Sequence, residues 1–137
     1  MNTPNNARAI ENVRIKHVLD KHPTIRLAIL FGSVAKGEAR RDSDLDLAVD
    51  VDRPLEEHEK IQLIGELAEV SGRPVDVVDL FSAGEPLLGQ IITGGRKILG
   101  DDTRYSCMVS KHLFNQADFM PYHRRILKER RSAWIAN

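Results

Sequence analysis

Apolar and polar residues follow strand spacing in three segments of this 137-residue chain. Residues 25–31 form a short apolar run, which is typical of a buried strand, although its length also suits a helical segment. Residues 45–51 alternate strictly, so one face of this strand is apolar while Asp44 and Asp46 share the other. A third strand is predicted over residues 75–80. The pattern therefore predicts a small sheet.

Helical spacing fills the segments around these strands. Residues 7–21 are predicted to form an amphipathic helix that buries Ile10, Val13 and either His17 or Val18. Such a helix would cover one face of the sheet.

The segment between the second and third strands carries the signals of a helix start and stop. Asp52 is a plausible N-cap, the helix is expected to run to about residue 70, and Gly72 ends it. Its predicted buried positions are Ile61, Ile64 and Ala68.

Two further helical segments complete the pattern. Residues 85–92 are predicted to form a helix, and the chain after about residue 101 is largely helical. The order of elements indicates an α/β (α+β) fold with a small mixed sheet flanked by helices. We expect one domain over residues 1–137, with a core at 7–100 and a helical C-terminal extension at 101–137.

Composition narrows the class of protein. The formal net charge is zero, so the molecule as a whole has no bias toward nucleic acid or anionic lipid, and direct nucleic-acid binding is not expected. The single cysteine, Cys107, excludes an internal disulfide, and no apolar run is long enough for a membrane span. We therefore expect a cytoplasmic protein.

Two carboxylates stand side by side on the second predicted strand. Asp44 and Asp46 are two residues apart, so both point to the same face, about 6.5 to 7 Å apart along the chain. Like charges this close are unfavourable unless a cation lies between them, and Mg²⁺ prefers oxygen ligands. The pair therefore predicts a metal-bound phosphoryl site.

A phosphate-binding turn precedes this strand. Gly32 allows a close backbone approach at the end of the first strand, and Ser33 offers a hydroxyl beside free N–H groups. A third carboxylate would come from residues 75–80, where Asp76 and Asp79 point to opposite faces; we prefer Asp76 as ligand or base, with Asp79 as a turn cap. Three carboxylates could hold two metal ions.

At this spacing the residues resemble a known family. The pattern Gly-Ser, ten residues, Asp-x-Asp, filled by Gly32, Ser33, Asp44 and Asp46, is similar to the signature of the DNA polymerase β-like nucleotidyltransferases. The short length makes the chain resemble the minimal nucleotidyltransferases, most closely the MntA-type antitoxins encoded beside HEPN-domain ribonuclease toxins. The likeness covers about residues 7–100.

The resemblance implies a reaction and a set of roles. Asp44, Asp46 and Asp76 would be the catalytic metal ligands for Mg²⁺, and Gly32 and Ser33 would hold the phosphates of ATP. The implied reaction is transfer of AMP from ATP to a tyrosine hydroxyl of the HEPN toxin, which blocks RNA cleavage by that toxin. Two alternatives are an antitoxin that only covers its toxin and an enzyme that modifies a small molecule such as an aminoglycoside.

The C-terminal region leaves two interpretations open. Residues 111–137 hold six basic residues against two acidic ones, more often a solvated face than an RNA site. An apolar stripe recurs there every seven residues and would pack either on the protein's own sheet or on a partner; its members are Leu113, Met120, Leu127 and Trp134.

Overall fold

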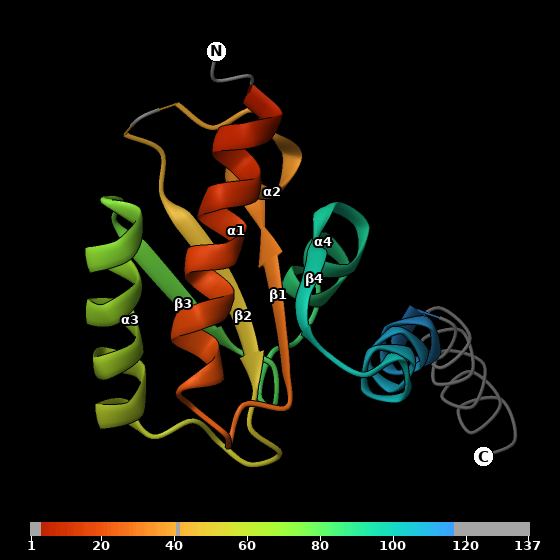
Figure 1. Ribbon diagram of the computed structural model, residues 1–137. Coiled ribbons are helices and arrows are strands. Elements are labelled where there is room, and N and C mark those ends of the chain that lie inside the picture. The colour runs from red at the N-terminus through yellow and green to blue at the C-terminus, as the bar shows by residue number, and fades with distance from the viewer. Residues whose placement is uncertain (1–3, 41, 117–137) are drawn as a thin grey trace, which may run out of the picture.

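A four-stranded mixed sheet forms the centre of the molecule in the computed structural model, which describes residues 4–40 and 42–116 (Figure 1). The strand order is β3-β2-β1-β4, with β2 and β3 parallel and the other neighbours antiparallel. The strands are β1 Leu27–Phe31, β2 Leu45–Asp50, β3 Val75–Asp79 and β4 Arg96–Gly100. The helices are α1 Pro4–Asp20, α2 Gly32–Lys36, α3 Glu57–Ser71 and α4 Leu87–Gly94, followed by a helical segment at residues 102–116.

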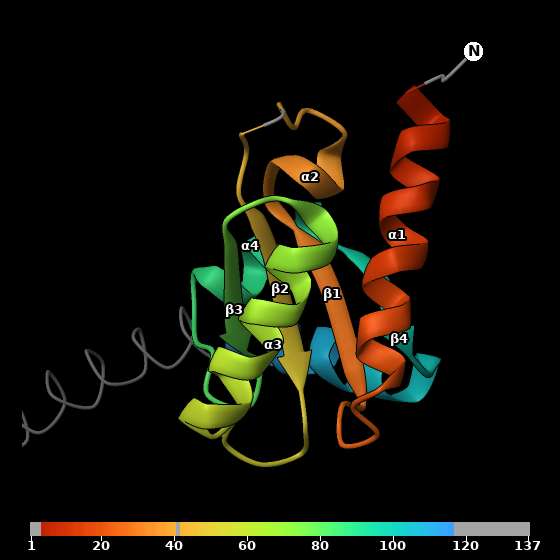
Figure 2. The same cartoon turned by 60° about the vertical axis from the view of Figure 1, so that its left-hand side comes forward.

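Each face of the sheet is covered by its own helices. Helices α1 and α3 lie side by side over one face, where their apolar residues bury the Leu45, Leu47 and Val49 side of β2. Helix α4 and residues 102–116 cover the opposite face (Figures 1 and 2), where Ala48 belongs to the second apolar cluster. The predicted alternation of β2 is confirmed: Leu45, Leu47 and Val49 are buried on one face, whereas on the other face Ala48 is buried between the partly exposed Asp46 and Asp50.

Helix α1 uses a different face from the one predicted. Ile10 and Val13 are 50% and 68% exposed, so their predicted burial is wrong. The buried residues are Ile15, Val18 and Leu19. In the first half of the helix, the side chains that face the rest of the protein are polar and form hydrogen bonds with other elements. A search for apolar periodicity cannot detect a helix face of this kind.

Helix α3 begins later than predicted. Its N-cap is Glu56, which forms a capping box with Glu59, whereas Asp52 has a left-handed backbone at φ 64° and pairs with Arg104 instead. Ile61 is 62% exposed, contrary to the prediction, and Leu63 and Leu67 are buried instead. The predicted stop at Gly72 is confirmed by its left-handed cap conformation at φ 67°.

Two short elements have no counterpart in the sequence prediction. Helix α2 spans only five residues, and strand β4 has a sequence with few apolar residues. Strand β4 pairs with β1 through backbone hydrogen bonds, so its place depends on a neighbour about 70 residues earlier in the chain rather than on its own pattern.

The start of α3 supplies a stability prediction. The Glu59 carboxylate accepts two hydrogen bonds from Arg53, at 2.7 and 3.0 Å, and one from the Glu56 N–H at 3.2 Å. The Arg53 guanidinium lowers the pKa of Glu59 to about 2. This stabilisation is complete above the ordinary pKa of 4.5 and is lost as the pH falls toward 2.

We expect Glu59→Ala to lower the free energy of unfolding by about 1 kcal/mol at neutral pH, and Glu59→Gln by less, because the amide oxygen still accepts the Glu56 N–H. Urea unfolding at neutral pH and near pH 3 measures both differences. A difference between the wild type and Glu59→Gln that is as large in acid as at neutral pH would exclude the ion pair as its cause.

Candidate active site

Asp46 and Asp76 are direct neighbours across the parallel pair of β2 and β3. Because the register places them opposite each other, both side chains share the face that α4 covers, one strand spacing of about 4.8 Å apart. Asp44 lies just before β2 and is exposed. The structure therefore brings the three predicted carboxylates to one end of the sheet.

The pKa of Asp46 reflects its partial burial and the nearby negative charges of the other two carboxylates. Partial burial and the negative charges of Asp76 and Asp44 raise the pKa of the Asp46 carboxyl. Within residues 4–40 and 42–116, however, no three His, Cys, Asp or Glu side chains converge closely enough to form a metal cluster. Because the three negative charges repel one another, the carboxylates stay apart when no cation lies between them. Their oxygen atoms are the kind of ligand that a hard divalent ion such as Mg²⁺ prefers.

Gly32 brings backbone against this carboxylate. It follows β1 at the end that pairs Phe31 with Asp46, and its φ of 75° lies in the left-handed region. A Cβ on Gly32 would overlap Oδ2 of Asp46. Only glycine therefore allows the chain to turn from β1 into α2 at this distance from the carboxylate.

Ser33 lies in the first turn of α2, beside Gly32. No side chain caps this helix, and its buried residues Val34 and Ala35 anchor it in the core. The first N–H groups of α2 therefore lie uncapped at the same end of the sheet as Asp46, in an arrangement that suits an anion.

Lys36 ends α2 and reaches the C-terminus of α4. Its Cε lies 3.1 Å from the position of a Cβ on Gly94, so the side chain passes over that glycine. A lysine beside the carbonyl end of a helix is favourably placed, because its positive charge complements the negative end of the helix dipole. The structure thus puts Lys36 on the α4 side of α2.

Asp79 is occupied by its own turn. Its carboxylate accepts hydrogen bonds from the N–H groups of Leu55 and Phe81 at 3.0 Å and from Oγ of Ser82 at 3.1 Å. The structure therefore makes Asp79 a turn cap, and Asp76 is the carboxylate of β3 that lies beside Asp46.

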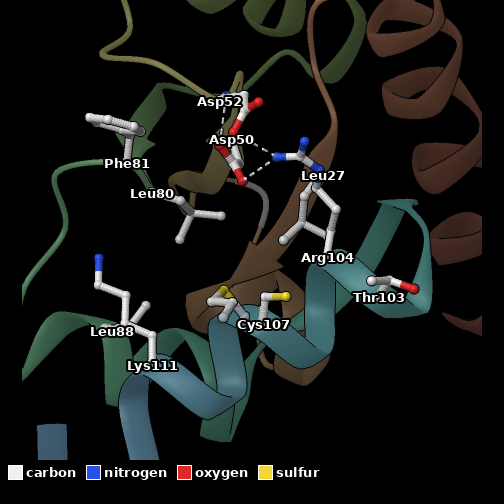
Figure 3. A pocket seen from close by; sticks show the side chains of 11 residues that line it. Leu27, Asp50, Asp52, Leu80, Phe81, Leu88, Thr103, Arg104, Cys107 and Lys111 are labelled. Atoms are coloured by element: carbon white, nitrogen blue, oxygen red, sulfur yellow. Dashed lines mark hydrogen bonds and ion pairs between the residues drawn. The ribbon is translucent and has the colours of Figure 1, made fainter. Parts of the chain in front are cut away.

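A hollow lies at the end of the sheet opposite to Asp46 (Figure 3). Its volume is about 530 Å³, and Arg104 bridges Asp50 and Asp52 at its rim, at 3.4 and 3.1 Å. Four residues of β2, or about 13 Å, separate Asp50 from Asp46. The floor and walls are apolar or carry small polar groups; they include Leu27, Leu80, Leu88, Cys107 and Met108. Sequence reasoning missed this hollow because its lining residues come from five separate segments of the chain.

The family of the chain follows from comparison with known proteins. The profile of the family described as "Polymerase beta, Nucleotidyltransferase" matches residues 13–104, which is more than half of the sequence. The chain belongs to this nucleotidyltransferase family. The matched stretch contains Gly32, Ser33 and the three carboxylates.

Relatives within this family are similar over much of the chain. The protein adenylyltransferase MntA of Shewanella oneidensis is 38% identical over 90 residues, which span 66% of this chain and 65% of that protein, just under two thirds of its length. A crystal structure of a toxin–antitoxin with AMP-PNP has a TM-score of 0.71 at 30% identity and covers 87% of this chain and 96% of its own. A crystal structure of the toxin–antitoxin MntA–HepT has a TM-score of 0.66 at 27% identity, and the match covers 88% of this chain and 96% of that chain.

A further solved structure shows the fold alone. A complex of tri-AMPylated Shewanella oneidensis HEPN toxin with an MNT antitoxin has a TM-score of 0.70 at 24% identity, covering 89% of this chain and 97% of that one. The predicted fold class and the resemblance to the minimal nucleotidyltransferases are thereby confirmed. No helix within the described residues is long and apolar enough to cross a bilayer.

Proposed function

We propose that this chain transfers AMP from ATP to a tyrosine hydroxyl of a HEPN-domain ribonuclease toxin and thereby neutralises that toxin. The observation that carries the proposal is the pairing of Asp46 with Asp76 beside the backbone of Gly32. A relative named protein adenylyltransferase MntA and a related toxin–antitoxin crystallised with AMP-PNP support ATP as the substrate. The need for ATP is also the reason to expect a cytoplasmic location.

The proposed mechanism assigns a task to each group. The N–H groups of the first turn of α2 and the Ser33 hydroxyl would bind the phosphates. Asp44, Asp46 and Asp76 would hold Mg²⁺, and together the three carboxylates would provide ligands for two ions. When bound, Mg²⁺ supplies charge neutralisation at the phosphates and at the leaving pyrophosphate.

The reaction forms one bond and breaks one. The tyrosine oxygen bonds to the α-phosphorus, the bond from the α-phosphorus to the bridging oxygen breaks, and pyrophosphate leaves. The hydroxyl proton passes to a carboxylate, for which the exposed Asp76 is placed at the edge of the site. The closeness of Asp46 to Gly32 would keep phosphates bound at α2 near the carboxylates.

The test uses purified protein, ATP labelled on the α-phosphate, Mg²⁺ and the HEPN protein encoded by the adjacent gene. We expect label on the partner with the wild type and none with an Asp44→Ala, Asp46→Ala double variant. An Asp50→Ala, Asp52→Ala double variant is the matched control, because it removes two carboxylates with the same spacing from the other end of β2. That control should still transfer label.

The outcomes separate the alternatives. If label never reaches the partner and the Asp44→Ala, Asp46→Ala variant still suppresses toxicity in cells, the chain neutralises its toxin by binding alone. If label reaches an aminoglycoside but not the protein, the substrate is a small molecule. Loss of both labelling and protection in this variant, with both kept in the control, supports the proposal.

A further inference from the structure

We propose that Arg73 is a positioning residue that fixes the loop ahead of Asp44 and so sets where the carboxylates of the site stand. This inference rests on the proposed function for its consequence in catalysis. Its structural part stands on the contacts of Arg73 alone.

The contacts of Arg73 join three segments of the chain. Its Nη1 donates to the carbonyl oxygens of Arg40 and Ser43, the latter at 3.2 Å, and its Nε donates to Glu11 of α1 at 2.8 Å. The side chains of Arg73 and Glu11 are only 14% and 20% exposed. A largely buried charge thus ties the loop of residues 37–44 to the first helix.

The register of the sheet explains why this position matters. Strands β2 and β3 are parallel, and the pairing of Leu45 with Val75 begins with a 2.8 Å hydrogen bond from the Leu45 N–H to the Pro74 carbonyl. The residues just before both strands therefore lie beside each other, so Arg73 faces the backbone that leads into Asp44.

The loop has one local turn of its own. The Ser43 N–H donates to the Arg40 carbonyl at 3.1 Å, and the Arg40 N–H donates to Oγ of Ser43 at 2.7 Å. Arg73 adds its hydrogen bonds to the same two residues from outside the loop. Asp44 is exposed and repelled by its neighbours, so this anchoring opposes the tendency of the carboxylate to move away from Asp46.

Arginine is suited to hold the loop and α1 at the same time. Its planar guanidinium offers several N–H donors in fixed directions, so it reaches two carbonyls and a carboxylate together. A lysine keeps the charge but lacks the fixed fork. We therefore expect Arg73→Lys to restore only part of what Arg73→Ala removes.

Hydrogen exchange tests the anchor without any chemistry at the site. We expect the Arg40 and Ser43 amides to exchange about 10-fold faster in Arg73→Ala, with buried β1 amides such as Leu30 unchanged. Arg53→Ala is the matched control, because it removes an ion pair of similar length, to Glu59, at the other end of the sheet. If the β1 amides accelerate as much as the loop amides, Arg73 is only a structural residue and the proposal is overturned.

Metal binding and turnover test whether Arg73 affects the carboxylates of the site. We expect the dissociation constant for Mn²⁺, read from the electron paramagnetic resonance of the free ion, to rise about 10-fold in Arg73→Ala and less in Arg73→Lys. In the transfer assay, the Mg²⁺ concentration that gives half of the maximal rate should likewise rise more in Arg73→Ala than in Arg73→Lys. The KM for the partner protein should stay unchanged in both variants.

The outcomes keep the two proposals apart. A wild type that transfers no AMP overturns the proposed function, while loop exchange and Mn²⁺ binding still decide the role of Arg73. A wild type that transfers AMP, together with unchanged loop exchange and unchanged Mn²⁺ binding in Arg73→Ala, overturns the positioning role and leaves the proposed function standing.

Discussion

Replacing Asp46 with asparagine is expected to stabilise the fold and to slow nucleotidyl transfer strongly. Burial and the charges of Asp76 and Asp44 raise the pKa of Asp46, so folding at neutral pH works against its negative charge. Asparagine has nearly the same shape and no charge, so it removes that cost. It also removes a proposed Mg²⁺ ligand, and we expect the transfer rate to fall by about 100-fold to 1,000-fold.

Thermal unfolding with and without Mg²⁺ checks the stability half of this prediction. Without Mg²⁺ the variant should melt at a higher temperature than the wild type at neutral pH. The difference in melting temperature between the variant and the wild type should shrink as the pH falls below the raised pKa of Asp46, because the wild-type carboxyl then becomes protonated in the folded state. Mg²⁺ should raise the melting temperature of the wild type more than that of the variant.

Asp79→Asn is the matched control on the neighbouring strand. Because the Asp79 carboxylate accepts three hydrogen bonds at its turn, loss of its charge should lower the melting temperature and leave transfer close to that of the wild type. If Asp46→Asn also melts earlier than the wild type, the repulsion assigned to the three carboxylates is wrong.

The second large effect is expected for Gly32→Ala. The new methyl group would overlap the Asp46 carboxylate, and the backbone would have to hold a φ of 75° with a side chain present. The left-handed backbone alone costs about 1 to 2 kcal/mol. Relief of the overlap requires a shift of Asp46 or of α2, and a displacement of about 1 Å in an active site costs about 100-fold in rate.

Gly65→Ala is the control that isolates this effect. Gly65 lies within α3, and nothing lies within 4 Å of the position of its Cβ. Alanine there should stabilise the helix by about 0.5 to 1 kcal/mol without any change in transfer. Urea unfolding and the labelled-ATP assay measure both variants. A Gly32→Ala protein with wild-type transfer would show that the backbone of Gly32 does not need to approach Asp46.

Part of the site could be predicted from sequence because its pieces are local. The alternation of residues 45–51 requires only the two-residue period of a strand, and it correctly placed the apolar residues of β2 on one face and Asp46 on the other. The spacing from Gly32 to Asp46 is likewise a local property, since only α2, one connecting segment and the start of β2 lie within it. The stop at Gly72 follows from backbone sterics alone.

Other features depend on partners far away in the chain. The inward stripe of α1 begins with Arg8, Glu11 and Asn12, which bond to Ala35, Arg73 and Arg96, so a search for apolar periodicity selected the wrong face. The sequence preferred Asp76 to Asp79 from strand alternation, but the position of Asp76 opposite Asp46 depends on the parallel register of β2 and β3, and the turn around Asp79 uses the N–H of Leu55, 24 residues away.

Local pattern alone was therefore enough to predict three strands, the main helices, the acidic face of β2 and the glycine turn, because each of these depends on neighbours within a few residues. The direct pairing of Asp46 with Asp76, the pairing of β4 with β1 and the hydrogen bond from Arg73 to Ser43 became visible only in the folded chain. These features arise from hydrogen bonds and charges between segments 24 to 70 residues apart, and such contacts leave no periodic signal in either segment.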